Sequence, residues 1–208
     1  MKKIVLATTN EHKLKEMRTL LEGFEILSLT DIGFSGEIEE TGKTTGENAK
    51  IKSLAILKYC KENKLDYGVL SDDAGLFVNS LGGEPGIYSA RYAGNHDNES
   101  NRKKLLANLE GKDDRTAYFE CSMCYADRNT TRLFVGRTYG TITKEEIGSK
   151  EFGYDCLFYS SDLKMTFGEA TEEEKGSVSH RGRAIEKFKH YMKKSNPNYK
   201  YIVEYNKV

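Results

Sequence analysis

The sequence lacks an excess of charge of either sign, because 32 Lys and Arg residues are matched by 32 Asp and Glu residues. Binding of duplex nucleic acid through its phosphates usually requires a basic excess, so the balance favours a small charged ligand instead. No apolar run approaches the roughly 18 to 20 residues that cross a bilayer. The N-terminal segment Met1–Thr9 also lacks the cleavage pattern of a signal peptide. We therefore expect a cytoplasmic protein with no membrane or nucleic-acid partner.

Cysteine is scarce, and its four copies do not form a recognisable metal set. Cys121 and Cys124 have the spacing of zinc and redox motifs, but no second such pair or histidine pair completes a zinc site. Their segment is typical of a strand, in which residues three apart point to opposite faces. Ordinary strand packing is thus favoured over a functional pair, and a chain of 208 residues needs no disulfide to form a core.

The order of the expected elements favours an α/β or α+β fold with a mixed sheet, because helices and strands alternate early and strands pair later. The chain length allows one large domain or two closely packed lobes. Strands are predicted over 3–7, 24–29, 67–71, 117–126, 131–139 and 156–159, with a further short strand near 201–203, and helices over 11–22, 44–60, 98–109 and from 182 onward, with capping boxes at 44–47 and 171–174.

The turn after the first strand is a candidate anion site. Thr8, Thr9 and Asn10 lie where a strand's carboxyl end meets a helix N-terminus, whose N–H groups and dipole favour negative charge. Lys13 adds a positive charge one turn later. The alternative is that Thr9 or Asn10 only caps the helix.

Adjacent carboxylates at Asp72 and Asp73 suggest a metal, because both must be solvated or paired. Mg²⁺ binds hard oxygen ligands, usually one or two carboxylates plus water and phosphate oxygens. The acidic loop with Glu39 and Glu40 offers further ligands. In a strand the two aspartates face opposite ways, so one should reach the cleft while the other binds backbone or a neighbouring loop. A solvated acidic turn is the alternative.

Two later motifs combine aromatic faces with charged groups, a combination that suits the binding of a purine base. In Phe152–Asp155 and Ser179–Arg181, rings can stack on a base, a guanidinium can donate to a keto oxygen and a carboxylate can accept from a ring N–H. Taken separately, each motif slightly favours a structural interpretation, in which Phe152 and Tyr154 are core aromatics and His180-Arg181 is a solvated helix start.

Together these motifs resemble the inosine triphosphate pyrophosphatases, which clear non-standard purine nucleotides. The resemblance covers most of the chain in the family's order: residues 6–13, Glu39-Glu40-Thr41-Gly42, Glu47-Asn48-Ala49, 71–76, 81–92, Phe152-Gly153-Tyr154-Asp155 and Glu174-Lys175 through Ser179-His180-Arg181-Gly182. It implies Mg²⁺-dependent hydrolysis of ITP, dITP and XTP to the monophosphate and pyrophosphate, which removes them from the nucleotide pool. It also implies one domain over 1–208, an elongated two-lobed α/β fold with a long mixed sheet, a site in the central cleft, and a homodimer.

The resemblance also implies roles for individual residues. Asp73 matches a catalytic residue that is both metal ligand and base, and Glu39 matches the second metal ligand. The substrate-binding positions are Thr8, Thr9, Asn10, Glu11, His12 and Lys13 for the phosphates, Lys52 as a further phosphate contact, Ala74, and Phe152, Gly153, Tyr154, Asp155, Lys175, His180 and Arg181 for the base. The implied mechanism is attack of a Mg²⁺-bound water on the α-phosphorus, with Asp73 accepting its proton.

Three positions depart from the family pattern, namely Thr9 in place of Gly, Ala74 in place of Ser and Cys156 in place of Pro. None removes a metal ligand, so they bear on rate and substrate range. Three other functions stay open: a related pyrophosphatase for pyrimidine or modified nucleotides, a phosphatase releasing the γ-phosphate, and a non-enzymatic nucleotide sensor.

Overall fold

Short apolar segments and capped helices alternate along residues 2–195, which are the residues that the computed structural model describes. The strand expected near 201–203 lies outside them. The elements are β1 (Lys3–Leu6), α1 (Glu11–Leu20), β2 (Glu25–Leu27), α2 (Thr45–Glu62), β3 (Gly68–Val78), β4 (Pro85–Gly86), α3 (Asn98–Asn108), β5 (Thr116–Ala126), β6 (Thr131–Ile142), β7 (Phe158–Ser160), α4 (Glu172–Val178) and α5 (His180–Ser195).

The strands form one mixed sheet of seven strands in the order β2-β1-β3-β5-β6-β7, with β4 paired to β3. β1 runs parallel to both β2 and β3, whereas β3, β5, β6 and β7 pair antiparallel. The β5–β6 hairpin turns at Asp127, whose carboxylate accepts the N–H groups of Asn129 and Thr130. The prediction of an α/β fold with a mixed sheet is confirmed.

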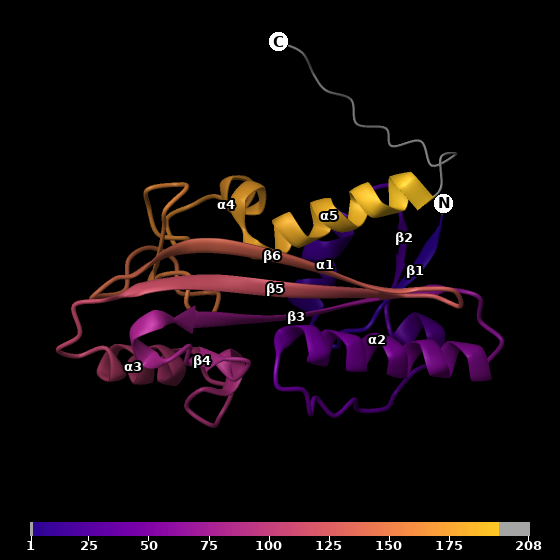
Figure 1. The fold of residues 1–208 in the computed structure, drawn as a ribbon, viewed down its shortest axis with the longest axis horizontal. Helices are drawn as coiled ribbons and strands as arrows, with labels where there is room; N and C mark the ends of the chain where they lie inside the picture. The colour runs from indigo at the N-terminus through magenta and orange to yellow at the C-terminus, as the bar shows by residue number, and fades with distance from the viewer. Residues whose placement is uncertain (1, 196–208) are drawn as a thin grey trace, which may run out of the picture.

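The long hairpin sets the elongated outline of the molecule (Figure 1). β5 and β6 run along its length, with α5 on one side of the sheet and α2 on the other. Both helices pack on β5, and each also covers one neighbouring strand: β6 for α5 and β3 for α2. No helix within residues 2–195 is long and apolar enough to cross a bilayer.

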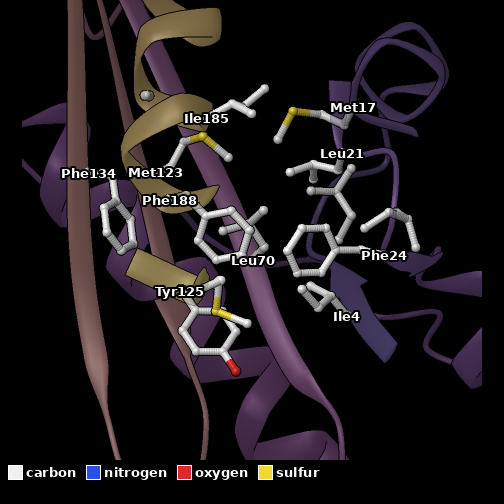
Figure 2. Close-up of a cluster of buried hydrophobic side chains, with 14 of the residues drawn as sticks. Ile4, Met17, Leu21, Phe24, Leu70, Met123, Tyr125, Phe134, Ile185 and Phe188 are labelled. Atoms are coloured by element: carbon white, nitrogen blue, oxygen red, sulfur yellow. The ribbon is translucent and has the colours of Figure 1, made fainter. Parts of the chain in front are cut away.

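α1 and α5 share one apolar core over the sheet (Figure 2). Met17 and Leu21 meet Ile185 and Phe188 above Leu70 of β3. Because these side chains recur at helical spacing on each helix and at alternate positions on the strand, burial of one stripe per element closes the core. This packing fixes the N-terminus of α5 against the N-terminal half of the molecule.

The prediction that a strand ends at Ser71 is wrong, because β3 is a single strand of 11 residues that continues through both aspartates to Val78. Its partner changes along the way. β1 pairs with β3 only as far as Leu70, while β5 pairs with β3 from Val69 to Val78. The ladder with β5 keeps the backbone extended through polar residues that local sequence alone marks as a strand end.

Cys121 and Cys124 face opposite sides of β5, as predicted. Cys121 belongs to the core under α1 and α5, whereas the Cys124 thiol lies beside Ser53 of α2. All four cysteines are buried and free, and burial raises the pKa of each thiol, to about 12 for Cys121.

We expect all four thiols to be inert in the folded protein, because both access and thiolate formation are suppressed. A thiol titration should detect them only after denaturation. Rapid reaction of any thiol under native conditions would contradict this expectation, and a dithiol-specific label would show whether it involves the 121–124 pair.

Candidate active site

The loop after β1 lies beside the aspartates of β3. Asn10 caps α1 by accepting the N–H of Lys13 at 3.1 Å, and the Thr8 hydroxyl accepts the N–H of Asn10 at 3.2 Å. Asn10 is therefore the N-cap of α1. This cap is compatible with anion binding, because Thr9, Asn10 and Glu11 stay exposed at the start of the helix. A cavity of about 170 Å³ lies between residues 8–11 and the 28–36 loop.

Asp72 points to the α1 and α5 side and is surrounded by cations. Its Oδ2 lies 3.2 Å from Lys13 Nζ and 3.3 and 3.2 Å from Nε and Nη2 of Arg181. Its side chain is 1% exposed, and burial alone would raise its pKa, but Lys13, Arg181 and Lys52 hold the pKa well below the ordinary value. The expectation that the non-cleft aspartate binds backbone or a loop is wrong, since its partners are side chains of two helices.

Asp73 points to the α2 side and keeps a half-buried carboxylate. Its Oδ2 accepts from Asn48 Nδ2 at 3.1 Å and its Oδ1 from the Ala74 N–H at 3.0 Å. Burial raises the pKa of Asp73 and the Glu40 charge adds to this, against the opposing effects of Lys52 and Asn48. A carboxylate with a raised pKa is a better proton acceptor, so the aspartate pair contains one fixed anion and one potential base.

The acidic loop meets α2 through Glu40. Lys52 Nζ lies 3.2 Å from Glu40 Oε2, and the lysine side chain is 11% exposed. Glu40 thus lies close enough to Asp73 to affect its pKa, while Glu39 is exposed on the same loop. Glu39 as a metal ligand stays a prediction. Within residues 2–195, no three His, Cys, Asp or Glu side chains gather as a ligand set.

Most of the predicted base-binding residues lie on the loop after β6 and on α4, whereas His180 and Arg181 lie on α5. Asp155 forms an ion pair with Lys175 of α4, and burial raises the Asp155 pKa against the effect of Lys175. The lysine Nζ also lies 5.2 Å from the centre of the Phe152 ring, which is 39% exposed. Tyr154 is buried and donates to the Ser89 carbonyl at 2.8 Å, so in this structure its hydroxyl stabilises the core.

His180 and Arg181 connect this region to the aspartates. The His180 ring stacks on Phe119 with centroids 4.9 Å apart, and burial together with neighbouring cations holds its pKa well below the ordinary value. Arg181 bonds to Asp72 and, through Nη1, to Glu16 of α1 at 2.7 Å. The structure therefore brings the phosphate loop, the aspartates and the start of α5 together, although Arg181 and Asp72 are 109 positions apart.

The Ham1 family model matches residues 4–191. The chain belongs to the Ham1 family. It is 44% identical to a dITP/XTP pyrophosphatase of Clostridium perfringens over 93% of this chain and 98% of that protein. It is 42% identical to a dITP/XTP pyrophosphatase of Bacillus subtilis over 90% of this chain and 95% of that protein. The solved structure of the Staphylococcus aureus Ham1 protein superposes with a TM-score of 0.85 at 36% identity, covering 94% of this chain and all of that one.

A second hollow of this Ham1-family protein is lined by neither Asp72 nor Asp73. A groove of about 930 Å³ follows the outer edge of β6 beside α4 and α5. Arg183 and Lys187 of α5 donate to the carbonyls of Arg137 and Val135 on that edge. Side chains that occupy edge carbonyls protect a strand from pairing with another chain, so we assign this groove a structural role.

Sequence reasoning assigned no role to two side chains of the site, Asn48 and Glu16, although Asn48 belongs to the Glu47-Asn48-Ala49 motif. Asn48 lies four residues after the Thr44 N-cap of α2, and Glu16 lies one turn after Lys13, so both positions are predictable as helix residues. The predicted capping box at 44–47 is only half formed, because the Glu47 carboxylate accepts the N–H of Lys43 instead of that of Thr44, whereas the box at 171–174 is complete. Neither has a local pattern that reveals a partner in a distant element. Only the packing of the helices on the sheet shows these contacts.

Proposed function

We propose that this chain hydrolyses non-standard purine nucleoside triphosphates, ITP, dITP and XTP, to the monophosphate and pyrophosphate. The observation that carries the proposal is that the neighbouring carboxylates of Asp72 and Asp73 lie in different surroundings. One aspartate anchors the cations of α1 and α5, while its neighbour presents a carboxylate of raised pKa beside Lys52. The relatives from Clostridium perfringens and Bacillus subtilis are named dITP/XTP pyrophosphatases, which agrees with this chemistry.

The residues fit a divalent cation of the Mg²⁺ type. Asp73 and the acidic-loop glutamates offer hard oxygen donors, and a site completed by water and phosphate oxygens does not require three protein carboxylates. When bound, Mg²⁺ would neutralise charge on the phosphate oxygens and orient the attacking water. Glu39 and Asp73 are the proposed ligands, with Glu40 adjacent.

The reaction requires a proton acceptor and a site for the departing pyrophosphate. Asp73 would accept the proton of the water that attacks the α-phosphorus, because its half-buried carboxylate is held in place by Asn48 and the Ala74 N–H. Lys13, Lys52 and the N–H groups at the start of α1 would hold the phosphates. Thr9 and Glu11 line the small cavity at this loop.

Base selection would depend on Arg181. The contacts with Asp72 and Glu16 use its Nε and one N–H on each terminal nitrogen, so two of the five N–H groups of a guanidinium are left to donate. A 6-keto oxygen can accept from them, whereas the 6-amino group of adenine cannot and would leave the donors unpaired. Phe152 and the Asp155–Lys175 pair would contact the ring.

Incubation with ITP, XTP, GTP, ATP and dTTP in the presence of Mg²⁺, followed by product identification, tests the proposal. Monophosphate and pyrophosphate from ITP and XTP are expected. Release of inorganic phosphate and a diphosphate would indicate a γ-phosphatase, and preference for dTTP would indicate a pyrimidine enzyme. Absence of turnover with every nucleotide would favour a sensor.

Arg181→Lys is expected to reduce kcat/KM for ITP by about a hundredfold and to narrow the preference for ITP over ATP, because lysine lacks the planar set of donors. Steady-state kinetics with both nucleotides measures this. Arg183→Lys is the matched control, since Arg183 lies on the same helix and bonds to Asp162 and a β6 carbonyl. An unchanged ratio of ITP to ATP in Arg181→Lys would contradict the assigned role.

A further inference from the structure

Asn48 is a buried polar side chain that joins two parts of the candidate site. It lies in the second turn of α2 and is 1% exposed. Its Oδ1 accepts the N–H of Gly42 in the acidic loop at 2.8 Å, and its Nδ2 donates to Asp73 Oδ2 at 3.1 Å. A single amide therefore connects the acidic loop to β3.

The orientation of this amide is set by its partners. The Gly42 N–H can only donate and the Asp73 carboxylate can only accept, so Oδ1 must face the loop and Nδ2 must face the strand. The approach of the loop also depends on glycine, because a Cβ at Gly42 would lie 2.6 Å from Asn48 Oδ1 and 2.9 Å from the Asn48 backbone nitrogen. The loop is thus held against the side chain at a distance that only glycine allows.

The contact also fixes the Asp73 carboxylate. Asn48 bonds to Oδ2 and the Ala74 N–H bonds to Oδ1, so both oxygens are held and rotation of the carboxylate is restricted. α2 itself is anchored, because the Thr45 hydroxyl bonds to Glu120 and Ser122 of β5. The amide is therefore presented from a rigid element.

We propose that Asn48 is a positioning residue, which orients the Asp73 carboxylate and holds the acidic loop at a fixed distance from it. This inference rests on the proposed function, since it concerns the same site. Residues that orient a ligand carboxylate without touching the metal typically alter affinity or activity by about 10- to 100-fold when replaced.

Glu47 provides a matched control on the same turn. Its Oε2 accepts the N–H of Lys43 at 2.6 Å, and its own N–H donates to the Thr44 hydroxyl at 3.1 Å. Glu47 thus holds the same loop at Lys43, the residue after Gly42. Its side chain is exposed and bonds to the loop backbone at Lys43, not to Asp73.

The test compares Asn48→Leu, Asn48→Asp and Glu47→Ala with the wild-type protein. Leucine has nearly the shape of asparagine and removes both bonds, whereas aspartate keeps an acceptor for Gly42 and loses the donor to Asp73. We expect both Asn48 variants to lower kcat for ITP by about 10- to 100-fold with KM changed less than about threefold, and Glu47→Ala to change kcat less than about threefold. Thermal unfolding without metal reports the stability of each variant.

A second readout does not depend on turnover. Mn²⁺ binding to the complex with α,β-imido-ITP, followed by electron paramagnetic resonance, should weaken about 10-fold or more in Asn48→Leu and stay near wild type in Glu47→Ala. If Asn48→Leu does not fold, Asn48→Asp decides the kinetic comparison.

Wild-type kcat in either Asn48 variant, or an equal loss in Glu47→Ala, would overturn the inference. A wild-type protein that releases no pyrophosphate would instead reject the proposed function. In that case Mn²⁺ binding alone would decide the role of Asn48, and unchanged binding in Asn48→Leu would reject it.

Discussion

Asp73→Asn is expected to lower kcat for ITP by about a thousandfold or more, because a carboxamide can neither accept the proton of the attacking water nor supply an anionic oxygen to a cation. The substitution keeps the size of the side chain. The Ala74 N–H can still donate to the amide oxygen of the substituted side chain. Nucleotide affinity should therefore change little, since the groups proposed to hold the phosphates and the base are untouched.

Two measurements separate catalysis from binding in this variant. Pyrophosphate release gives kcat, and calorimetric titration with α,β-imido-ITP gives affinity without hydrolysis. Asp162→Asn serves as control, because Asp162 forms an exposed ion pair with Arg183 away from the site. Turnover close to wild type in Asp73→Asn would reject Asp73 as the base.

Asp72→Asn is expected to lower the free energy of unfolding by about 3 kcal/mol, because it leaves Lys13 and Arg181 without the buried anion that offsets their charge. The pKa of Asp72 in the folded protein lies below its ordinary value near 3.8. Its charge therefore stabilises the fold fully above the pKa of the unfolded chain, and this contribution is lost as pH falls through the lower folded value.

Denaturant unfolding at neutral pH and at acidic pH measures both effects. The difference between wild type and Asp72→Asn should be largest at neutral pH and should shrink as the pH falls towards the folded pKa. Glu62→Gln is the control, since the exposed Lys58–Glu62 pair at 3.9 Å should contribute less than about 0.5 kcal/mol. An Asp72 variant as stable as this control would show that the cations are satisfied by other groups.

Local patterns predicted most of the elements, and the exceptions have a common cause. The helices α1 and α2 begin at the predicted caps, and the β5–β6 hairpin turns between the strands predicted over 117–126 and 131–139. The strand predicted over 67–71 ends too early, because the polar centre of β3 resembles the end of a strand. Pairing with β5 overrides that local signal, and such pairing involves residues about 50 positions away in sequence.

The sequence by itself determined which strand residues point to opposite faces of the sheet. A strand has a period of two, so Asp72 and Asp73 had to point to opposite sides of the sheet, as did Cys121 and Cys124. The family resemblance also predicts that Asp73, and not Asp72, is the catalytic aspartate.

Only the tertiary structure decided which partner each carboxylate meets. Asp72 finds Lys13 and Arg181 because one apolar core packs α1 beside the start of α5, and Asp73 finds Asn48 because α2 covers the other face. These contacts join residues 25 to 109 positions apart. Sequence spacing specifies the face on which a side chain lies, whereas the charge and hydrogen-bond donors across from it depend on how distant elements pack.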